Sequence, residues 1–324
     1  MGFLTELYYI SVLFWRVFFP RGNFKAEDVP DLTGRVAIVT GGNVGIGRET
    51  IKVLLQRNAK VYMASRSRDK AEGAIKRLKD ETGKEAIFLE LDLSSLASVR
   101  KAASEFLGKE AELHILFNNA GVMGPPIDQV TADGFDMQFG TNVIGHFLFT
   151  ELLMPALFAG VQSSPDHHAR VITTSSSGAM YGKIDFDAIR EGPGRRRYSK
   201  EMLYAQSKLA NVIVAREVAK RYGGKGIVSI SVDPGSIKTD LQRYYRQVSG
   251  FRLLLSELVE KALLRPAPFG ALTQLWAGTS PEAIHENGKY AIPTAQIAQC
   301  RAEAYDDELG KKMWAFLEDA VKKA

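Results

Sequence analysis

The chain has 324 residues, of which 45% are hydrophobic and 24% are charged, and its formal net charge at pH 7 is +5. This length and apolar content are enough for one large hydrophobic core, and no internal repeat suggests a second domain. The net charge is modest for the size, and no basic stripe is interleaved with aromatic residues, so nucleic-acid binding is not supported. The single cysteine, Cys300, precludes an internal disulfide and fits a reducing, intracellular compartment.

An apolar, aromatic-rich segment occupies residues 3–19 and leads into a linker that ends near residue 30. Its uncharged run, residues 7–15, falls short of the roughly 20 apolar residues that a bilayer span needs. With Arg16 and Arg21 behind it, the segment could lie as a helix in a membrane interface, on the cytosolic face of the endoplasmic reticulum or a lipid droplet. Packing on its own domain or on a neighbouring subunit of a homo-oligomer is the alternative. We therefore divide the chain into this helix and linker, residues 1–30, and one domain, residues 31–324.

The first strand of that domain is predicted at residues 35–40, and a glycine-rich turn at 41–47 leads from it into an amphipathic helix. Glycines let a backbone approach a pyrophosphate, and a helix N-terminus offers it N–H donors and partial positive charge. The spacing departs from the common dinucleotide pattern G-x-G-x-x-G and rests on Gly41, Gly45 and Gly47. A P-loop is excluded because its Lys-Ser/Thr pair is absent. The strand–turn–helix context favours a dinucleotide site over a mere tight turn.

The second strand, residues 60–64, ends at Ser65 and Arg66, where a fold that binds NAD usually places an Asp or Glu to hold the ribose 2′-hydroxyl. A guanidinium suits a 2′-phosphate instead, and no carboxylate stands nearby to repel that phosphate. The pattern therefore predicts NADP(H) as the cofactor, with a solvated arginine at a helix start as the alternative.

Later strands alternate with helices over about 200 residues, which predicts a doubly wound parallel α/β sheet of the Rossmann type. These strands are expected at residues 86–91, 114–117, 170–174 and 227–232. Asp92, Asn119 and Ser176 follow three of the strand ends, and ligands bind such sheets at the carboxyl ends of the strands. Asp92 could accept from an adenine amino group, and Ser94 could cap the next helix.

Tyr204 and Lys208 stand four residues apart, so a helix would project both from one face. A free phenol has a pKa of about 10, and ionising it at pH 7 costs roughly 4 kcal/mol. A unit charge about 4 Å away at an effective dielectric of 20 is worth about the same. Lys208 is therefore expected to make Tyr204 acidic enough to pass a proton near neutral pH. The spacing alone is weak, because amphipathic helices produce it by chance, and the glycine motif strengthens it.

Together these motifs resemble those of the short-chain dehydrogenase/reductase family, over about residues 33–295. The shared pattern joins the Thr-Gly-x-x-x-Gly-Ile-Gly turn from Thr40, the Asn-Asn-Ala-Gly run from Asn118, a serine, Tyr-x-x-x-Lys and a Pro-Gly pair. The stretches around Arg66 and Lys208, with the C-terminal segment at 288–309, are similar to retinol dehydrogenases and related fungal reductases.

The resemblance implies catalytic roles for four residues. Tyr204 would give its proton to a carbonyl oxygen while hydride arrives from the nicotinamide. Lys208 would lower the phenol pKa and bind the nicotinamide ribose, and Ser176, the second serine after its strand, would hold the substrate oxygen. Asn142 would support a water relay to the lysine. The resemblance also implies a set of cofactor-binding residues, namely Gly41, Asn43, Gly45, Ile46, Gly47, Arg66, Asp92, Asn119, Tyr204 and Lys208, with Thr239 near the carboxamide.

The sequence leaves the substrate less defined. An insertion at residues 181–200 could shape the substrate mouth or could be a surface excursion, and its arginines at 195–197 are read as a solvated loop. Apolar residues at 241–264 either cover the nicotinamide and favour a hydrophobic substrate, or are ordinary helix-packing positions. Residues 302–322 predict an amphipathic closing helix. The five histidines form no metal pattern, so no metal site is predicted.

The leading hypothesis is an NADP(H)-dependent oxidoreductase acting on hydrophobic alcohols, aldehydes or ketones, with Tyr204 as general acid and base. The alternative is a non-catalytic protein that senses NADP(H) on the same fold. The joint presence of Asn142, Ser176, Tyr204 and Lys208 argues against it, because a sensor needs no such set.

Overall fold

The structure of the protein, a computed structural model, describes residues 22–238 and 264–322. The predicted helix at residues 3–19, Thr239 and nearly all of the apolar stretch at 241–264 lie outside the described residues. The expectations attached to them, including membrane or subunit contact, stay predictions.

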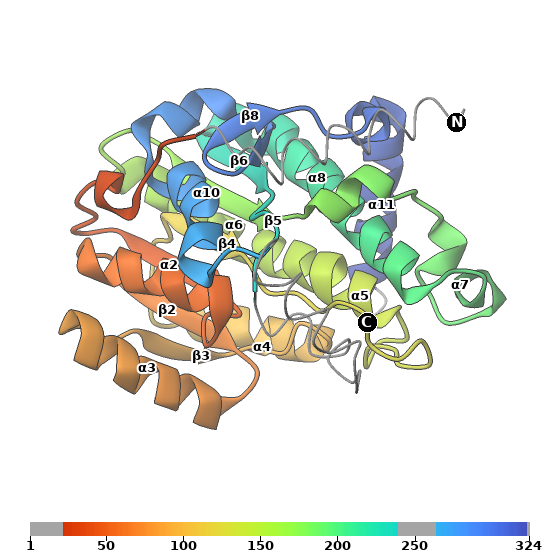
Figure 1. Ribbon diagram of the computed structural model, residues 1–324, viewed down its shortest axis with the longest axis horizontal. Coiled ribbons are helices and arrows are strands. Elements are labelled where there is room, and N and C mark those ends of the chain that lie inside the picture. Colours follow the sequence, from red (N-terminus) through yellow and green to blue (C-terminus); the bar gives the residue numbers. More distant parts are fainter. Residues whose placement is uncertain (1–21, 239–263, 323–324) are drawn as a thin grey trace.

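One eight-stranded sheet forms the middle of the domain (Figure 1). Its strands are β1 (Val36–Thr40), β2 (Lys60–Ser65), β3 (Ile87–Glu90), β4 (Ile115–Asn118), β5 (Ala169–Thr174), β6 (Ile227–Val232), β7 (Tyr290–Ile292) and β8 (Gln296–Ala298). The strand order is β3-β2-β1-β4-β5-β6-β7-β8, parallel up to β7, with β8 antiparallel at the edge. The chain reverses direction across the sheet between β1 and β4, and that point is where a Rossmann sheet opens its ligand crevice.

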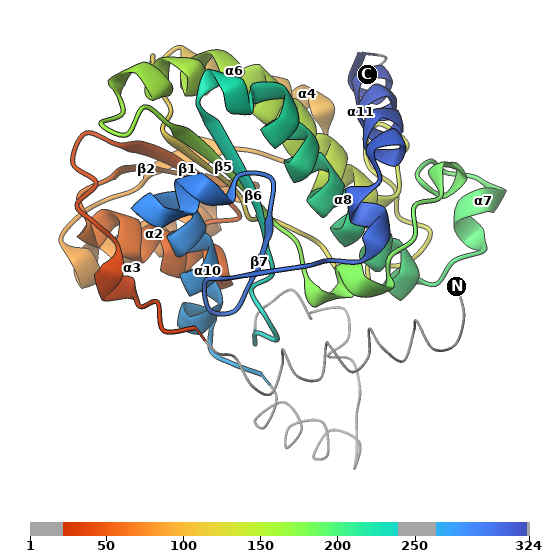
Figure 2. The same cartoon turned by 90° about the horizontal axis from the view of Figure 1, so that it is seen from above.

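Helices cover both faces of the sheet, as Figure 2 shows from above. One layer holds α2 (Gly45–Gln56), α3 (Arg68–Thr82) and α10 (Ala267–Thr279). The other holds α4 (Leu96–Leu107), α6 (Gly145–Ser163), α8 (Lys200–Tyr222) and α11 (Asp307–Lys322). Two further helices are short: α5 (Met137–Phe139), which runs into α6 through a π-helical turn, and α7 (Pro193–Arg196). Because β-strand side chains alternate between faces, Ile38 packs in one core and Val39 in the other.

The predicted doubly wound fold is confirmed, and the six predicted strands agree with the observed ones to within two residues at each end. The pair β7 and β8 was not predicted, because three-residue strands give no usable periodicity. The cap of α4 is Ser95, whose side chain accepts from the Ser98 backbone N–H, so the expectation for Ser94 is wrong. The closing helix α11 begins at Asp307, five residues later than expected, after a short 3₁₀ turn.

A continuous helical stretch, Met137–Ser163, is the one part of the described chain that is long and apolar enough to cross a membrane. Its most apolar window of 18 residues has a mean hydropathy of 1.6, and 72% of that window is buried inside the domain. The helix packs against α4 and the sheet, so burial in the core accounts for its composition.

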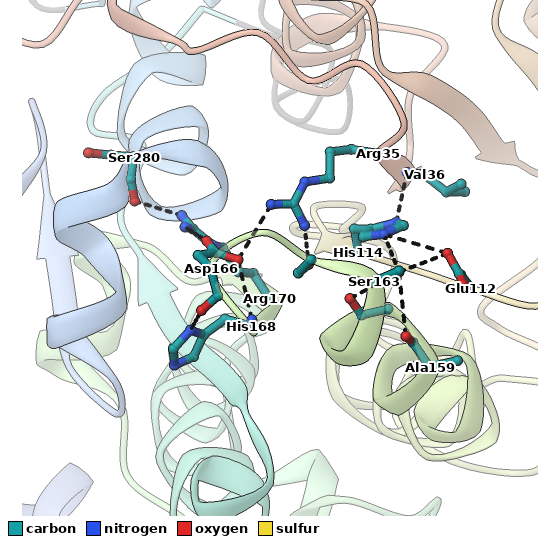
Figure 3. A network of polar contacts seen from close by, with 12 residues as sticks. Arg35, Val36, Glu112, His114, Ala159, Ser163, Asp166, His168, Arg170 and Ser280 are labelled. Carbon is teal, nitrogen blue, oxygen red and sulfur yellow. Dashed lines mark hydrogen bonds and ion pairs between the residues drawn. The ribbon is translucent and has the colours of Figure 1, made fainter.

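A polar network connects the amino ends of β1, β4 and β5 (Figure 3). The ligand crevice lies at the other end of these strands, their carboxyl ends. Arg170, whose side chain is only 6% exposed, donates to the Ser280 carbonyl at 2.7 Å and pairs with Asp166 at 3.0 Å. Arg35 pairs with Asp166 at 3.4 Å. Burial alone would raise the pKa of Asp166, but the hydrogen bond and charge of Arg170 and the charge of Arg35 hold it below its usual value.

Replacing this carboxylate, Asp166→Asn, should lower the free energy of unfolding by about 1–3 kcal/mol at pH 7. The figure is below the 3–5 kcal/mol of a fully buried pair because Asp166 is 29% exposed. A depressed carboxyl pKa stabilises the fold above the unfolded pKa of about 4, and the effect is lost as pH falls through the folded value. The difference between wild type and variant, measured by urea unfolding, should therefore close below pH 4. Asp80→Asn, an exposed carboxylate, is the control and should change little.

Candidate active site

A cavity of about 470 Å³ lies at the carboxyl ends of the strands. Its walls come from the glycine turn, the end of β2, the loop after β4, the end of β5, helix α8 and the loop after β6. The lining residues include Gly41, Asn43, Gly45, Ile46, Gly47, Arg66, Asn119, Ser176, Tyr204 and Lys208. Ten of the predicted site residues therefore share one cavity, although they are spread over 168 positions of the sequence from Gly41 to Lys208.

The shape of the glycine turn depends on the backbone conformation of Gly41 and on close packing at Gly47. Gly41 has a φ of +67°, a conformation that costs glycine little and other residues more. Gly47 packs so tightly that a Cβ there would lie 2.5 Å from the Gly41 carbonyl oxygen and 2.6 Å from Asn119 Nδ2. The turn therefore brings the N-terminus of α2 to the cavity wall, where its free N–H groups favour an anion.

Thr40 and Asn119 hold the turn against the loop that follows β4. The Asn119 side chain donates to the Thr40 carbonyl at 2.8 Å. The Thr40 hydroxyl accepts from the backbone N–H groups of Asn119 and Ala120, both at 2.9 Å. Asn119 thus lines the cavity and also fixes the backbone of the glycine turn.

Two cations stand at the end of the cavity beside β2. Arg66 and Lys70 are exposed, and both line the cavity together with Ser67. Within the described part of the chain neither forms an ion pair, so both are available to a ligand. The Ser65 hydroxyl is buried, does not line the cavity and has no hydrogen-bond partner among the described residues. The basic character predicted from Arg66 is therefore shared with Lys70.

Ser176, Tyr204 and Lys208 meet where β5 and α8 face each other. Helix α8 begins after Ser199, whose side chain caps it by accepting from the Met202 N–H at 3.3 Å, and Tyr204 lines the cavity from the first turns of this helix. Tyr204 is hydrogen-bonded to the Ser176 side chain. Lys208 donates to the Thr174 carbonyl at 2.9 Å, and its Nζ lies 5.7 Å from the Tyr204 ring centroid.

The three consecutive serines at positions 175–177 have different surroundings. Ser175 is buried, and its hydroxyl donates to the Lys208 carbonyl at 2.7 Å, so it anchors α8 to the sheet. Ser176 keeps its hydroxyl at the cavity, where it also accepts from the Gly178 N–H at 3.1 Å. Ser177 does not line the cavity. This geometry favours Ser176 as the serine of the site.

The acidity expected of Tyr204 is not found in the protein alone. Burial raises the pKa of Tyr204 to about 12, the hydrogen bond with Ser176 lowers it in part, and the charge of Asp233 raises it. Burial lowers the pKa of Lys208 to about 8, against the charge of Asp233. Lys208 is not among the causes of the Tyr204 shift, so the expected lowering of the phenol pKa by Lys208 is not found in the protein without cofactor, where burial has the largest effect.

Among the predicted site residues that the structure describes, Asn142 and Asp92 lie outside the cavity lining. The Asn142 side chain is buried and holds both backbone polar groups of Val122, accepting from its N–H at 2.8 Å and donating to its carbonyl at 3.1 Å. A Cβ on Gly121 would lie 3.3 Å from Asn142 Oδ1 and 3.6 Å from Lys208 Nζ, so Asn142 stands directly behind the wall. Asp92 accepts from the N–H and hydroxyl of Ser94, and its contact with adenine stays a prediction.

Comparison with known proteins decides the family. A family model described as short chain dehydrogenase matches residues 35–188. A short-chain dehydrogenase/reductase of Armillaria gallica is 54% identical over 94% of this chain and 95% of its own length. The chain belongs to the short-chain dehydrogenase/reductase family. It is therefore an oxidoreductase of a family that uses nicotinamide cofactors.

One further relative and one solved structure support the predicted branch and the fold of this dehydrogenase/reductase. Retinol dehydrogenase 11 of Mus musculus is 38% identical over 87% of this chain and 85% of its own length. The similarity supports the predicted branch of retinol dehydrogenases and fungal reductases. The solved structure of an uncharacterized protein from Mycobacterium Paratuberculosis has a TM-score of 0.72 and 29% identity, and it covers 93% of this chain and 98% of that one. It confirms the fold over nearly the whole domain.

The insertion of this dehydrogenase/reductase is folded and lies away from the cofactor cavity. None of residues 181–200 lines that cavity, and residues 183–187 with Tyr198 and Lys312 line a separate hollow of about 360 Å³. Arg195 is only 2% exposed, donates to the Gln129 carbonyl at 3.2 Å and pairs with Asp136 at 3.5 Å. The solvated-loop interpretation is therefore wrong for Arg195, because the ion pair joins the insertion to Asp136 and is buried.

Proposed function

We propose that this short-chain dehydrogenase/reductase transfers hydride between NADP(H) and a hydrophobic alcohol, aldehyde or ketone, with Tyr204 as the proton donor and acceptor. One observation carries the proposal. Ser176, Tyr204 and Lys208 form one end of a cavity whose other end is the glycine turn with Arg66 and Lys70.

The residues of this cavity fit a dinucleotide. The glycine turn and the N-terminus of α2 offer backbone N–H donors to a pyrophosphate, with no side chain at Gly41, Gly45 or Gly47 in the way. The cavity volume of about 470 Å³ is in the usual range for small-molecule sites. When bound, the nicotinamide would supply or accept the hydride.

The protonation states support a role for Tyr204 as a donor. With its pKa near 12, the phenol keeps its proton at neutral pH and can give it to a substrate oxygen. Ser176, hydrogen-bonded to Tyr204, is placed to donate to the same oxygen as negative charge develops on it. Lys208, with its pKa near 8, is mostly an ammonium at pH 7 and would stabilise the phenolate that remains. These states favour carbonyl reduction near neutral pH.

The preference for NADP(H) rests on Arg66 and Lys70. A guanidinium fork matches a phosphate with two hydrogen bonds, and an ammonium adds a second positive charge. The segment that ends β2 carries no carboxylate at the cavity to hold a ribose 2′-hydroxyl. The proposed substrate class follows retinol dehydrogenase 11, whose name specifies an apolar alcohol.

The test is turnover by the purified full-length protein with NADPH or NADH. Retinal and other apolar aldehydes and ketones should oxidise NADPH, with kcat/KM at least about tenfold higher than with NADH, since a charge-assisted hydrogen bond is worth about 1.5–3 kcal/mol. Small polar ketoses serve as the comparison. Tight NADPH binding without turnover across the panel would favour the sensing protein instead. Failure to bind either cofactor would refute both functions.

A further inference from the structure

His146 is a buried histidine that no part of the proposed chemistry uses. It lies in the first turn of α6 and is only 3% exposed. Both ring nitrogens have partners: Nδ1 lies 3.0 Å from the Asn142 carbonyl oxygen, and Nε2 lies 2.9 Å from the Thr40 hydroxyl. The ring therefore bridges the catalytic layer of helices and the end of β1.

The partners determine which nitrogen carries the hydrogen. The Asn142 carbonyl can only accept, so Nδ1 must donate to it. The Thr40 hydroxyl accepts two backbone N–H groups, from Asn119 and Ala120, and these occupy both of its lone pairs. Its own hydrogen is therefore free to be donated to His146 Nε2. This pattern requires a neutral imidazole, and burial lowers the pKa of His146 to about 4, with the charge of Lys208 acting in the same direction.

The hydrogen bonds continue from His146 to the catalytic helix. The Asn142 side chain donates to the Ser207 hydroxyl at 3.0 Å, and that hydroxyl donates to the Tyr204 carbonyl at 2.7 Å. An unbroken path of buried polar groups thus joins the strand that precedes the glycine turn to the turn of α8 that carries the phenol. His146 is the link in the middle of this path, and its ring connects the Asn142 carbonyl to the Thr40 hydroxyl.

We propose that His146 is a positioning residue, which locks the Thr40 hydroxyl as an acceptor for the loop after β4 and so holds the glycine turn in register with Tyr204. By accepting the Thr40 hydrogen at Nε2, while Nδ1 is held by the Asn142 carbonyl, the ring fixes the Thr40 side chain where its hydroxyl meets the N–H groups of Asn119 and Ala120. Without it, the hydroxyl keeps the Phe117 carbonyl, 3.2 Å away, as an acceptor, but the Thr40 side chain loses its tie to α6. The effect on cofactor binding rests on the proposed function, whereas the ordering of the loop does not.

His114 provides a matched control. It is equally buried, at 3% exposed, and is hydrogen-bonded through both nitrogens, accepting from the Val36 N–H at 3.0 Å and lying 3.0 Å from the Ser163 hydroxyl (Figure 3). It lies at the amino end of β4, away from the cavity. Loss of the His114 ring should lower the free energy of unfolding as loss of the His146 ring does, but it should leave the loop after β4 unchanged.

The experiment compares His146→Leu, His146→Gln and His114→Leu in the full-length protein. Amide hydrogen exchange at Asn119 and Ala120, without cofactor, should be about tenfold faster in His146→Leu and unchanged in His114→Leu once each rate is corrected for global stability. NADPH, titrated by fluorescence, should bind about tenfold more weakly to His146→Leu and within about twofold of wild type to His114→Leu. His146→Gln can accept from Thr40 through its amide oxygen, and it should recover most of both losses.

Equal effects of the two leucine variants, or wild-type exchange and binding in a folded His146→Leu, would overturn the proposal. If His146→Leu does not fold, His146→Asn takes its place, because its shorter amide cannot reach Thr40. The proposal then requires the asparagine variant to lose loop protection and the glutamine variant to keep it. If wild type binds no NADPH, the proposed function fails, while the exchange rates still decide the role of His146.

Discussion

Replacing the phenol, Tyr204→Phe, should lower kcat for carbonyl reduction by about a thousandfold and leave NADPH affinity within a few fold of wild type. The change removes one oxygen and keeps the ring that fills the cavity wall, so the loss should fall on proton transfer, which is commonly worth 10²–10⁴-fold in rate. Stopped-flow or steady-state NADPH oxidation measures the first quantity, and fluorescence titration measures the second.

Tyr222→Phe is the matched control for this prediction. It lies on the same helix, α8, and its hydroxyl donates to Glu151 at 2.9 Å, far along the helix from the cavity. Turnover should therefore be unchanged in this variant. Wild-type rates in Tyr204→Phe would show that another group supplies the proton, and an equal loss in both variants would point to a general defect of the helix.

The sequence predicts this fold well because each strand is an apolar run that ends at a polar or glycine-rich motif. In a parallel sheet such runs are buried on both faces, and their carboxyl ends meet at one edge. The convergence of Gly41, Arg66 and Ser176 on one cavity follows from that rule, because each comes just after a strand, whereas Tyr204 reaches the cavity from helix α8. The short strands β7 and β8 could not be predicted in this way. They are strands because β7 pairs with β6 and β8 pairs with β7, and not because of a pattern in their own residues.

Properties set by three-dimensional surroundings could not be read from the chain. Arg195 looks like its two exposed neighbours in sequence, and only the fold buries it against Asp136. The pKa of Tyr204 depends on how completely α8 and the strand ends exclude water, which a four-residue spacing does not encode. His146 is a lone histidine in an apolar helix, and its significance lies in its reach to Thr40, 106 residues earlier.

The choice between NADPH and NADH should reverse in Arg66→Asp. Losing the guanidinium removes a charge-assisted hydrogen-bond donor worth about 1.5–3 kcal/mol, and the new carboxylate repels a 2′-phosphate while it can accept from a ribose 2′-hydroxyl. NADPH should bind about a hundredfold more weakly, and NADH as well as before or better. Lys70→Ala should weaken NADPH binding by less, roughly three- to tenfold, because a mobile ammonium makes a less directional contact.

Arg68→Asp is the control that distinguishes a direct contact between Arg66 and the 2′-phosphate from an effect of the overall charge. Arg68 stands two positions further on, also exposed, with its guanidinium 4.6 Å from the Phe88 ring centroid and outside the cavity lining. The variant makes the same change in net charge, but solvent and salt screen it from the ligand over a distance of about 8 Å at physiological ionic strength. The ratio of NADPH to NADH affinity should therefore stay near wild type in Arg68→Asp. An equal shift in both variants would mean that long-range charge selects the cofactor, and an unchanged ratio in Arg66→Asp would exclude Arg66 as the selector.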